Sequence, residues 1–268
     1  MNDKLFELVF NEYLTIAEEG IEEFFTPCAE VEKAMEYTLS AGGKRVRPVL
    51  TLAVCDMLGG DVTKALPYAV AIELIHTYSL IHDDLPCMDD DAERRGKPAS
   101  HIVFGEGMAL LAGDGLLTKA FEIASKGESL EAIAVIAANA YKMVLGQGSE
   151  FVNKDASVSV DNTLEIYSHK TSALLVGAAV CGALAAGAKK EDIEKIEEFA
   201  LNLGLAFQVI DDLLDADEED SLFISAVGRK KAEEYAAEFS EKAYAAVSDF
   251  KKNEFVTELI NKLLHRKG

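Results

Sequence analysis

The sequence predicts an all-α fold, and three observations support this prediction. The last of the five prolines is Pro98, so the 170 residues from Ala99 to Gly268 contain none. Because proline breaks the interior of a helix, such a stretch, rich in Ala, Leu, Glu and Lys, favours helices. Apolar residues recur at three- and four-residue intervals from Ile193 to Leu214, and no stretch shows the sustained alternation of a strand. From typical helix lengths we expect about ten helices.

Glycines and one loop divide the predicted helices in chain order. Three groups of glycines mark helix ends or kinks: Gly42-Gly43, Gly59-Gly60 and Gly146-Gln147-Gly148. Residues 92–100 form the clearest loop. The uncharged stretch from Thr171 to Ala188 is rich in Ala and Gly and predicts a tightly packed, buried helix. No linker or repeat divides the chain, so we expect a single helical domain over residues 1–268.

The composition limits the classes of partner. The chain has 47 acidic and 26 basic side chains and a formal net charge of −21. Nucleic acids and anionic lipid surfaces are bound by a surplus of Lys and Arg, so we expect neither as a partner. The four cysteines form no C-x-x-C pair, and the N-terminus shows no apolar signal-peptide run. We therefore expect a reduced, cytoplasmic protein without a membrane anchor.

Thirteen of the 47 acidic residues lie in two short windows, residues 83–93 and 211–220. A charge run is usually a solvated helix end, but both windows follow segments that are apolar enough to be buried. Carboxylates at the edge of a core repel one another and lose hydration, so they persist where a cation compensates them. Mg²⁺ prefers such oxygen ligands and usually binds one or two carboxylates together with substrate phosphates. The windows therefore predict a Mg²⁺ site for a phosphorylated ligand.

Two other metal sites fit the acidic windows less well. An EF-hand calcium loop needs alternating acids, a central Gly and a terminal Glu. The run Pro86-Cys87-Met88 interrupts the first window, and the second window contains no Gly. The pair His82-Asp83 also matches part of a metal phosphohydrolase site, but the other four histidines form no second cluster in the sequence.

Three basic groups are candidate anion sites, because Arg and Lys bind phosphate oxygens. They are Lys44-Arg45-Val46-Arg47, Arg94-Arg95 and His169-Lys170-Thr171. Any one of them, taken alone, reads as ordinary exposed cations. His76 lies two helical turns before Asp83 on the same face, and a buried core histidine is the alternative interpretation for it.

Together these residues resemble the trans-isoprenyl diphosphate synthases, or polyprenyl synthetases, and most of all the bacterial farnesyl diphosphate synthase group. The resemblance runs in order and spacing from about Glu30 to Asp215. Its motifs are Gly42 to Pro48, Ile75 to Asp91, Arg94-Arg95-Gly96, Ala112-Gly113-Asp114, Gly146-Gln147, His169-Lys170-Thr171 and Gly204 to Asp215. The resemblance implies the isoprenoid synthase fold, with helices around a central catalytic cavity, and a homodimer.

The resemblance also implies a prenyltransferase that condenses isopentenyl diphosphate head to tail with dimethylallyl or geranyl diphosphate. It implies Mg²⁺ ions on the allylic diphosphate, usually three, which Mn²⁺ can replace. The implied metal ligands are Asp83, Asp89 and Asp211. The carboxylates implied to orient them or to bind through water are Asp84, Asp212 and Asp215. The implied allylic site is completed by Arg94, Lys170, Thr171 and Gln208. The implied metal-free site for isopentenyl diphosphate consists of Gly43, Lys44, Arg47, His76 and Arg95.

The residue types suit ionisation, condensation and elimination. Loss of diphosphate from an allylic carbon leaves a carbocation and a highly charged leaving group, which Mg²⁺ and cationic side chains neutralise. The carbocation then needs a dry pocket with oriented dipoles, and the Lys170 carbonyl, the Thr171 hydroxyl and Gln208 are candidates. In the family the departing diphosphate is the usual base, which agrees with the lack of an obvious side-chain base in the sequence.

The product length is implied by the family's cavity floor, which lies four and five residues before the first Asp. These positions are Ser79 and Tyr78. A bulky Tyr78 stops the product near C15, so we expect (E,E)-farnesyl diphosphate, with C20 geranylgeranyl diphosphate as the alternative. Helical spacing alone places Ser79, and not Tyr78, nearer to the Asp83 face.

The chain departs from the family after Asp215. The family usually continues with a Gly/Lys-rich loop whose Lys reaches the allylic diphosphate, whereas here Asp217–Asp220 run directly into a segment that resembles the next helix start. The missing loop leaves an inactive partner subunit as an alternative, against which both Asp-rich motifs argue. A terpene cyclase shares the first Asp-rich motif, but it needs no isopentenyl site and its second metal motif differs.

Overall fold

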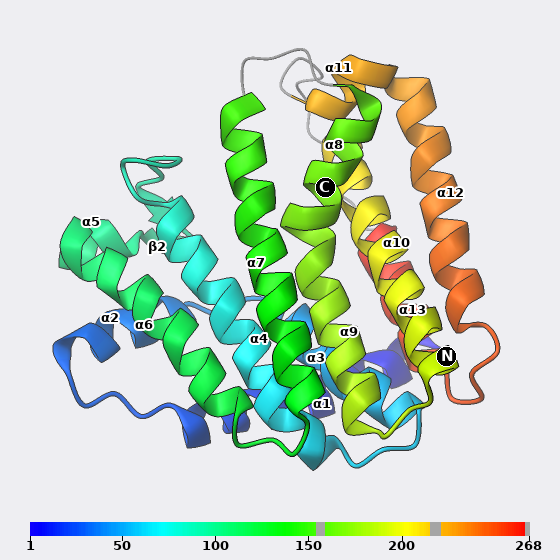
Figure 1. The fold of residues 1–268 in the computed structure, drawn as a ribbon, viewed down its shortest axis with the longest axis horizontal. Helices are drawn as coiled ribbons and strands as arrows, with labels where there is room; N and C mark the ends of the chain where they lie inside the picture. The colour runs from blue at the N-terminus through cyan, green and yellow to red at the C-terminus, as the bar shows by residue number, and fades with distance from the viewer. Residues whose placement is uncertain (154–158, 215–220, 266–268) are drawn as a thin grey trace.

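The structure, a computed structural model, describes residues 1–153, 159–214 and 221–265. These residues form thirteen α-helices, one π-helical turn (η1) and a hairpin of two short strands (Figure 1). In chain order they are α1 (Asp3–Phe24), α2 (Glu30–Leu39), α3 (Val46–Met57), α4 (Val62–Asp83), β1 (Glu93–Arg94), β2 (Lys97–Pro98), α5 (Ser100–Phe104), α6 (Glu106–Ala124), α7 (Leu130–Asn153), α8 (Val160–Tyr167), η1 (Ser168–Ser172), α9 (Ala173–Ala185), α10 (Lys190–Leu214), α11 (Leu222–Val227), α12 (Arg229–Val247) and α13 (Glu254–Leu264). The all-α prediction is confirmed. The helices outnumber the expected ten because glycines such as Gly105 and Gly228, both with positive φ, separate short helices from long ones.

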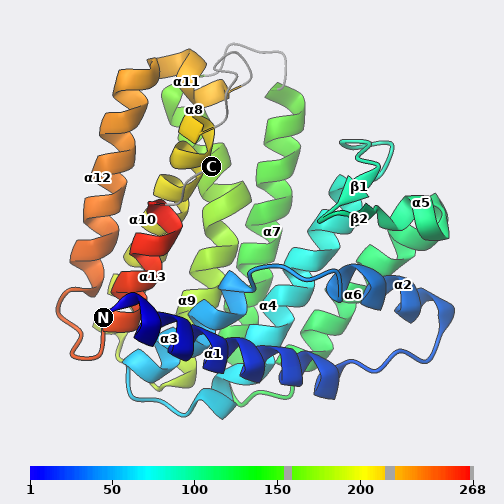
Figure 2. The same cartoon turned by 180° about the vertical axis from the view of Figure 1, so that it is seen from behind.

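The long helices run roughly side by side around α9. Figure 1 shows α4, α7, α9, α10 and α12 in this arrangement. Figure 2, the view from behind, shows α1 crossing in front of them. Helix α9 contacts α3, α4, α7 and α10. The core therefore centres on α9, and the ends of α4 and α10, which carry the two Asp-rich motifs, project from it.

The expected buried helix is confirmed as α9, although it begins at Ala173 because the π-helical turn occupies the preceding residues. Every residue from Ala173 to Gly182 is buried. A Cβ at Gly182 would lie 2.3 Å from the carbonyl oxygen of Thr51. Only glycine therefore lets α3 approach α9 this closely.

The segment expected as a loop, residues 92–100, contains the hairpin. Arg94 pairs with Lys97, so only Arg95 and Gly96 form the turn. Both have positive φ, 55° and 74°, the combination that a type I′ hairpin turn requires. The strands are only two residues long and show no alternation that a sequence pattern could reveal.

Candidate active site

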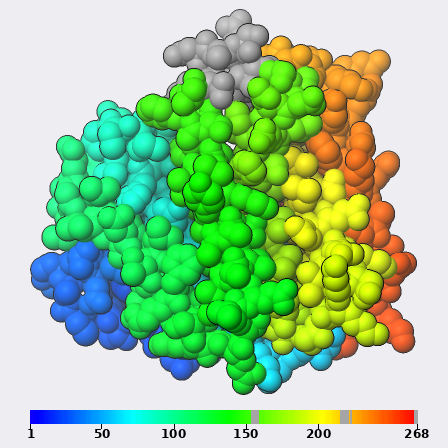
Figure 3. All heavy atoms as spheres, in the orientation of Figure 1, coloured from blue at the N-terminus to red at the C-terminus, as the bar shows by residue number. Residues whose placement is uncertain are grey.

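A cavity of about 710 Å³ lies between α4, α6, α7 and η1. Its lining includes residues expected from the sequence, namely Arg47, His76, Tyr78, Ser79, Asp83, Lys170 and Thr171. The remaining lining residues are mostly apolar: Leu80, His82, Leu85, Cys87, Met88, Leu110, Met143, Val144, Gln147, Gly148, Phe151 and Val152. Figure 3 shows this side of the molecule, with α7 running down its middle. A cavity with apolar walls and a few charged groups suits a ligand with a hydrocarbon part and a charged head.

The first Asp-rich motif begins where α4 ends. Asp83 is the last residue of α4, and the backbone N–H of Asp89 donates to its carbonyl oxygen over 2.9 Å, which brings the two residues together. Burial raises the pKa of Asp83 to about 6; Lys170 opposes this shift and Asp89 adds to it. A carboxylate in this environment gains from a nearby cation.

A partly exposed Arg94 and a buried Asp84 form an ion pair beside this motif. Asp84 is 1% exposed, and Arg94 Nε donates to its Oδ1 over 2.8 Å. Arg94 also contacts Asp91 Oδ2 at 2.9 Å. Burial raises the pKa of Asp84, and the hydrogen bond from Arg94 opposes the shift. Arg94 is thus held against the acidic motif by two carboxylates.

The second Asp-rich motif lies at the end of α10. Asp212 is buried and accepts hydrogen bonds from the Tyr167 hydroxyl, from Ser221 Oγ at 2.8 Å and from Gln208 Nε2 at 3.4 Å. Asp211, one residue earlier, is partly exposed. Asp215 lies outside the described residues. The partners of Asp212 leave its carboxylate fixed in one orientation.

Lys170 and Thr171 lie on η1, a π-helical turn of a kind that is frequent at functional sites. A Cβ at Gly146 would lie 2.4 Å from the Lys170 backbone nitrogen, so this glycine allows α7 to pack against the turn. The Lys170 ammonium pairs with Glu150 of α7. Thr171 Oγ1 donates to Gln208 Oε1 over 2.7 Å, which joins η1 to the second Asp-rich motif.

A second pocket of about 530 Å³ lies against the first cavity. Its lining contains all five residues expected at the metal-free diphosphate site: Gly43, Lys44, Arg47, His76 and Arg95. Arg47 and His76 line both pockets. Burial, together with Arg47 and Arg95, holds the pKa of His76 well below its ordinary value. His76 is therefore neutral at pH 7 and offers hydrogen bonds, while the charge comes from the cations around it.

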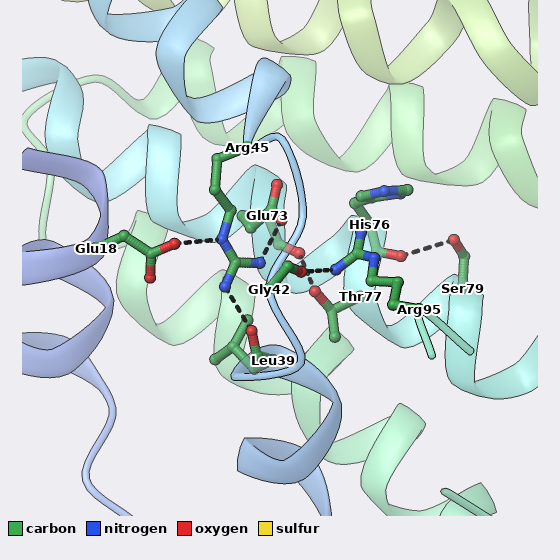
Figure 4. Close-up of polar contacts among 9 residues, drawn as sticks. All are labelled: Glu18, Leu39, Gly42, Arg45, Glu73, His76, Thr77, Ser79 and Arg95. Carbon is green, nitrogen blue, oxygen red and sulfur yellow. Dashed lines mark hydrogen bonds and ion pairs between the residues drawn. The ribbon is translucent and has the colours of Figure 1, made fainter. Parts of the chain in front are cut away.

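The turn before α3 shapes this second pocket. A Cβ at Gly43 would lie 2.8 Å from the Arg95 guanidinium, so only glycine lets that group approach. Arg95 donates to the Gly42 carbonyl oxygen (Figure 4). Arg45 has a left-handed φ of 44°, a conformation that costs a non-glycine residue about 1–2 kcal/mol. Its buried guanidinium is bonded to Glu18 and Glu73, which holds the residue in this conformation.

Tyr78 and Ser79 both line the main cavity, so the helical spacing that favoured Ser79 does not separate them. Tyr78 is buried, and its ring meets that of His82 edge to face, with 5.6 Å between the centroids. Burial raises the pKa of the Tyr78 hydroxyl to about 12. Ser79 Oγ donates to the His76 carbonyl oxygen over 2.8 Å.

Several residues around these pockets were not expected from the sequence. Glu73, Glu150 and Tyr167 each bond to an expected residue or its neighbour in the chain. Gln147 lines the main cavity together with the apolar residues of α7. The Gly146-Gln147 motif was the one signal that could have located Gln147, whereas the others depend on contacts between distant segments.

The residues present suit a magnesium ion held partly by a ligand. Within the described residues, no three His, Cys, Asp or Glu side chains gather as a complete metal site. Asp89 lies close enough to Asp83 to contribute to the raised pKa of the Asp83 carboxyl. Mg²⁺ needs only one or two such oxygens when substrate phosphates supply the others. None of the described helices is both long and apolar enough to cross a bilayer.

Comparison with known proteins identifies the family to which the chain is similar. The family model described as polyprenyl synthetase matches residues 28–228. A geranylgeranyl diphosphate synthase of Cyanophora paradoxa is 47% identical over 73% of this chain and 69% of its own length. A farnesyl diphosphate synthase of Geobacillus stearothermophilus is 44% identical over 75% of this chain and 71% of its own. The chain spans about half the length of some chloroplast relatives that it matches.

Solved structures give the same result for the fold. A geranyltranstransferase from Thermotoga maritima superposes with a TM-score of 0.87 and 35% identity, covering 96% of this chain and 99% of that chain. The predicted isoprenoid synthase fold is confirmed. Relatives with both C15 and C20 product names match at similar identity, so the comparisons leave the product length open. The family model and these relatives together show that the chain belongs to the polyprenyl synthetase family, the trans-prenyl diphosphate synthases.

Proposed function

We propose that the protein is a Mg²⁺-dependent prenyltransferase that condenses isopentenyl diphosphate with dimethylallyl and geranyl diphosphate to form (E,E)-farnesyl diphosphate. One observation carries the proposal. The five residues of the expected metal-free diphosphate site line one pocket, and Arg47 and His76 separate it from a cavity that contains Asp83, Lys170 and Thr171. Two diphosphate substrates therefore have adjoining places with a shared wall.

In this proposal Asp83, Asp89 and Asp211 hold the metal. When bound, Mg²⁺ neutralises the allylic diphosphate and the charge that develops as it leaves. Asp84 and Asp212 are buried among protein partners, so we assign them the role of orienting groups. Arg94 and Lys170 supply positive charge to the same leaving group. Both are paired with carboxylates in the structure, and these pairs loosen as phosphate oxygens arrive.

The main cavity suits the hydrocarbon part of the reaction. Its walls are mostly apolar, which suits a carbocation because water would capture it. The Thr171 hydroxyl and Gln208 supply oriented dipoles beside it. The double bond of isopentenyl diphosphate attacks the allylic carbon, and the departing diphosphate then removes a proton. No side-chain base is assigned to this step.

The product length is proposed from the cavity floor. Tyr78 is buried on the cavity lining with its ring against His82, where it limits the growing chain to C15. Geranylgeranyl diphosphate is the second candidate, because the 47% identical Cyanophora relative carries that name. Incubation with Mg²⁺, isopentenyl diphosphate and each allylic primer, followed by product analysis, tests both. Lack of any condensation would contradict the proposal and favour an inactive partner subunit.

We also propose a homodimer. Exposed apolar side chains on α6 and α7 include Leu111, Tyr141 and Val144, at 56%, 65% and 52% exposure, and burial against a second copy would remove them from water. A mass in solution near twice 29.0 kDa is expected; a monomer at micromolar concentration would exclude it. The cytoplasmic location and the single domain stay predictions.

A further inference from the structure

The second pocket contains a buried carboxylate that an anion site should avoid. Glu73 on α4 is 1% exposed and lies one turn before His76. It is the one acidic residue among the lining residues of this pocket, which also include four cations: Lys44, Arg45, Arg47 and Arg95. A carboxylate here repels a diphosphate, so its presence requires a function that outweighs the repulsion.

One oxygen of Glu73 holds the strained turn in place. Glu73 Oε1 accepts a hydrogen bond from Arg45 Nη1 over 2.7 Å. Arg45 also donates to Glu18 Oε1 at 2.8 Å and to the Leu39 carbonyl oxygen at 2.5 Å (Figure 4). Arg45 has a left-handed backbone and lies in the turn that carries Lys44 and leads to Arg47, so its three bonds anchor the segment that presents both cations.

The other oxygen of Glu73 is buried without a hydrogen-bond partner, and so is Nε of Arg47. Burial lowers the pKa of Arg47 and of Arg95, and Glu73 opposes the shift in both. The negative charge of Glu73 therefore stabilises two neighbouring guanidinium groups that would otherwise repel each other.

We propose that Glu73 is a positioning residue for the metal-free diphosphate pocket: it anchors Arg45 and keeps Arg47 and Arg95 together before the diphosphate binds. Glu73 itself does not bind the diphosphate. The inference rests on the proposed function, because it assigns this pocket to isopentenyl diphosphate. Preorganised cations bind an anion without first having to be brought together. The resulting gain in affinity for the diphosphate therefore exceeds the cost of its repulsion by Glu73.

The variant Glu73→Gln tests this proposal, since it keeps the shape and an oxygen acceptor for Arg45 but removes the charge. We expect the KM for isopentenyl diphosphate to rise about tenfold, with the KM for geranyl diphosphate within about twofold of wild type. The matched control is Glu18→Gln, which bonds the same guanidinium from a side chain that is 43% exposed and is not part of the pocket lining. Its KM values should remain near wild type.

A binding measurement separates this inference from the proposed function. Inorganic pyrophosphate is titrated calorimetrically into each protein in EDTA, which removes metal from the Asp-rich motifs. We expect about tenfold weaker binding to Glu73→Gln than to wild type or Glu18→Gln. Equal or tighter binding by Glu73→Gln than by wild type, or an equal rise in both KM values, overturns the inference. The proposed function is still supported in that case if the wild-type protein condenses the two substrates. If wild type makes no product, the proposed function fails, and the titration still decides the role of Glu73. If Glu73→Gln does not fold, Glu73→Asp is tested instead. Its shorter side chain keeps the charge but moves it away from Arg45, so it should weaken pyrophosphate binding. Unchanged binding overturns the inference.

Discussion

The Thr171 hydroxyl donates a hydrogen bond of 2.7 Å to the side-chain oxygen of Gln208. This bond joins the π-helical turn beside the main cavity to α10, because the amide of Gln208 in turn donates to Asp212. The orientation of the second Asp-rich motif therefore depends on a residue in the cavity lining.

Replacing Thr171 with Val removes this bond and leaves Gln208 Oε1 without its donor. We expect kcat to fall roughly tenfold, because the dipoles beside the reacting carbon lose their orientation. Steady-state kinetics with geranyl diphosphate measure this. Thr171→Ser keeps the hydroxyl and should retain most activity, whereas a Val variant as active as wild type would contradict the role of the bond.

Asp83→Ala and Asp211→Ala should each lower turnover by about 100-fold or more, because a lost metal ligand removes several kcal/mol of charge stabilisation. Circular dichroism should show an intact fold for both. Glu197→Ala, on the exposed face of α10, serves as the control of equal charge change. Near-normal rates in either Asp variant would refute its assignment as a metal ligand.

Tyr78→Ala should lengthen the product from C15 to C20, since it removes a buried ring from the cavity lining. Tyr78→Phe keeps the ring and should keep the C15 product. Chromatography of the dephosphorylated products distinguishes the two. An unchanged C15 product from the Ala variant would show that another residue ends the chain.

Gly146→Ala places a methyl group 2.4 Å from the Lys170 backbone nitrogen, so α7 and η1 must move apart. We expect a loss of about 1–3 kcal/mol in the free energy of unfolding, together with reduced turnover. Gly148→Ala, two residues later on the same helix, meets nothing within 4 Å. It should match wild type or gain stability, because Ala favours helices. Urea denaturation compares the two; equal stabilities would show that this close packing is unimportant.

The sequence predicts the helical class and the two acidic windows because both depend on local patterns. The proline-free stretch from Ala99 and the spacing of the apolar residues in α10 reflect helix geometry directly. The two acidic windows stand out because charged groups at the ends of buried helices are unusual. The assignment of the pocket residues came from the resemblance to the polyprenyl synthetases. The sequence could not reveal Glu73 as a pocket residue, since it resembles any acid on a helix until α3 and α4 are packed together. The hairpin was missed because two-residue strands leave no pattern.

The hairpin turn at Arg95-Gly96 also limits which insertions and deletions the protein can tolerate. Arg94 contacts Asp84 of the first acidic motif, and its neighbour Arg95 reaches the carbonyl oxygen of Gly42. Arg94 is the last residue of β1 and Arg95 is the first residue of the turn, so inserting or deleting one residue here would change which side chain faces Asp84 and which faces Gly42. Most surface loops tolerate changes in length. This hairpin should accept substitutions at Lys97 but no change in the number of its residues. We therefore expect the length of the hairpin to be kept in related sequences even where the surrounding surface residues differ.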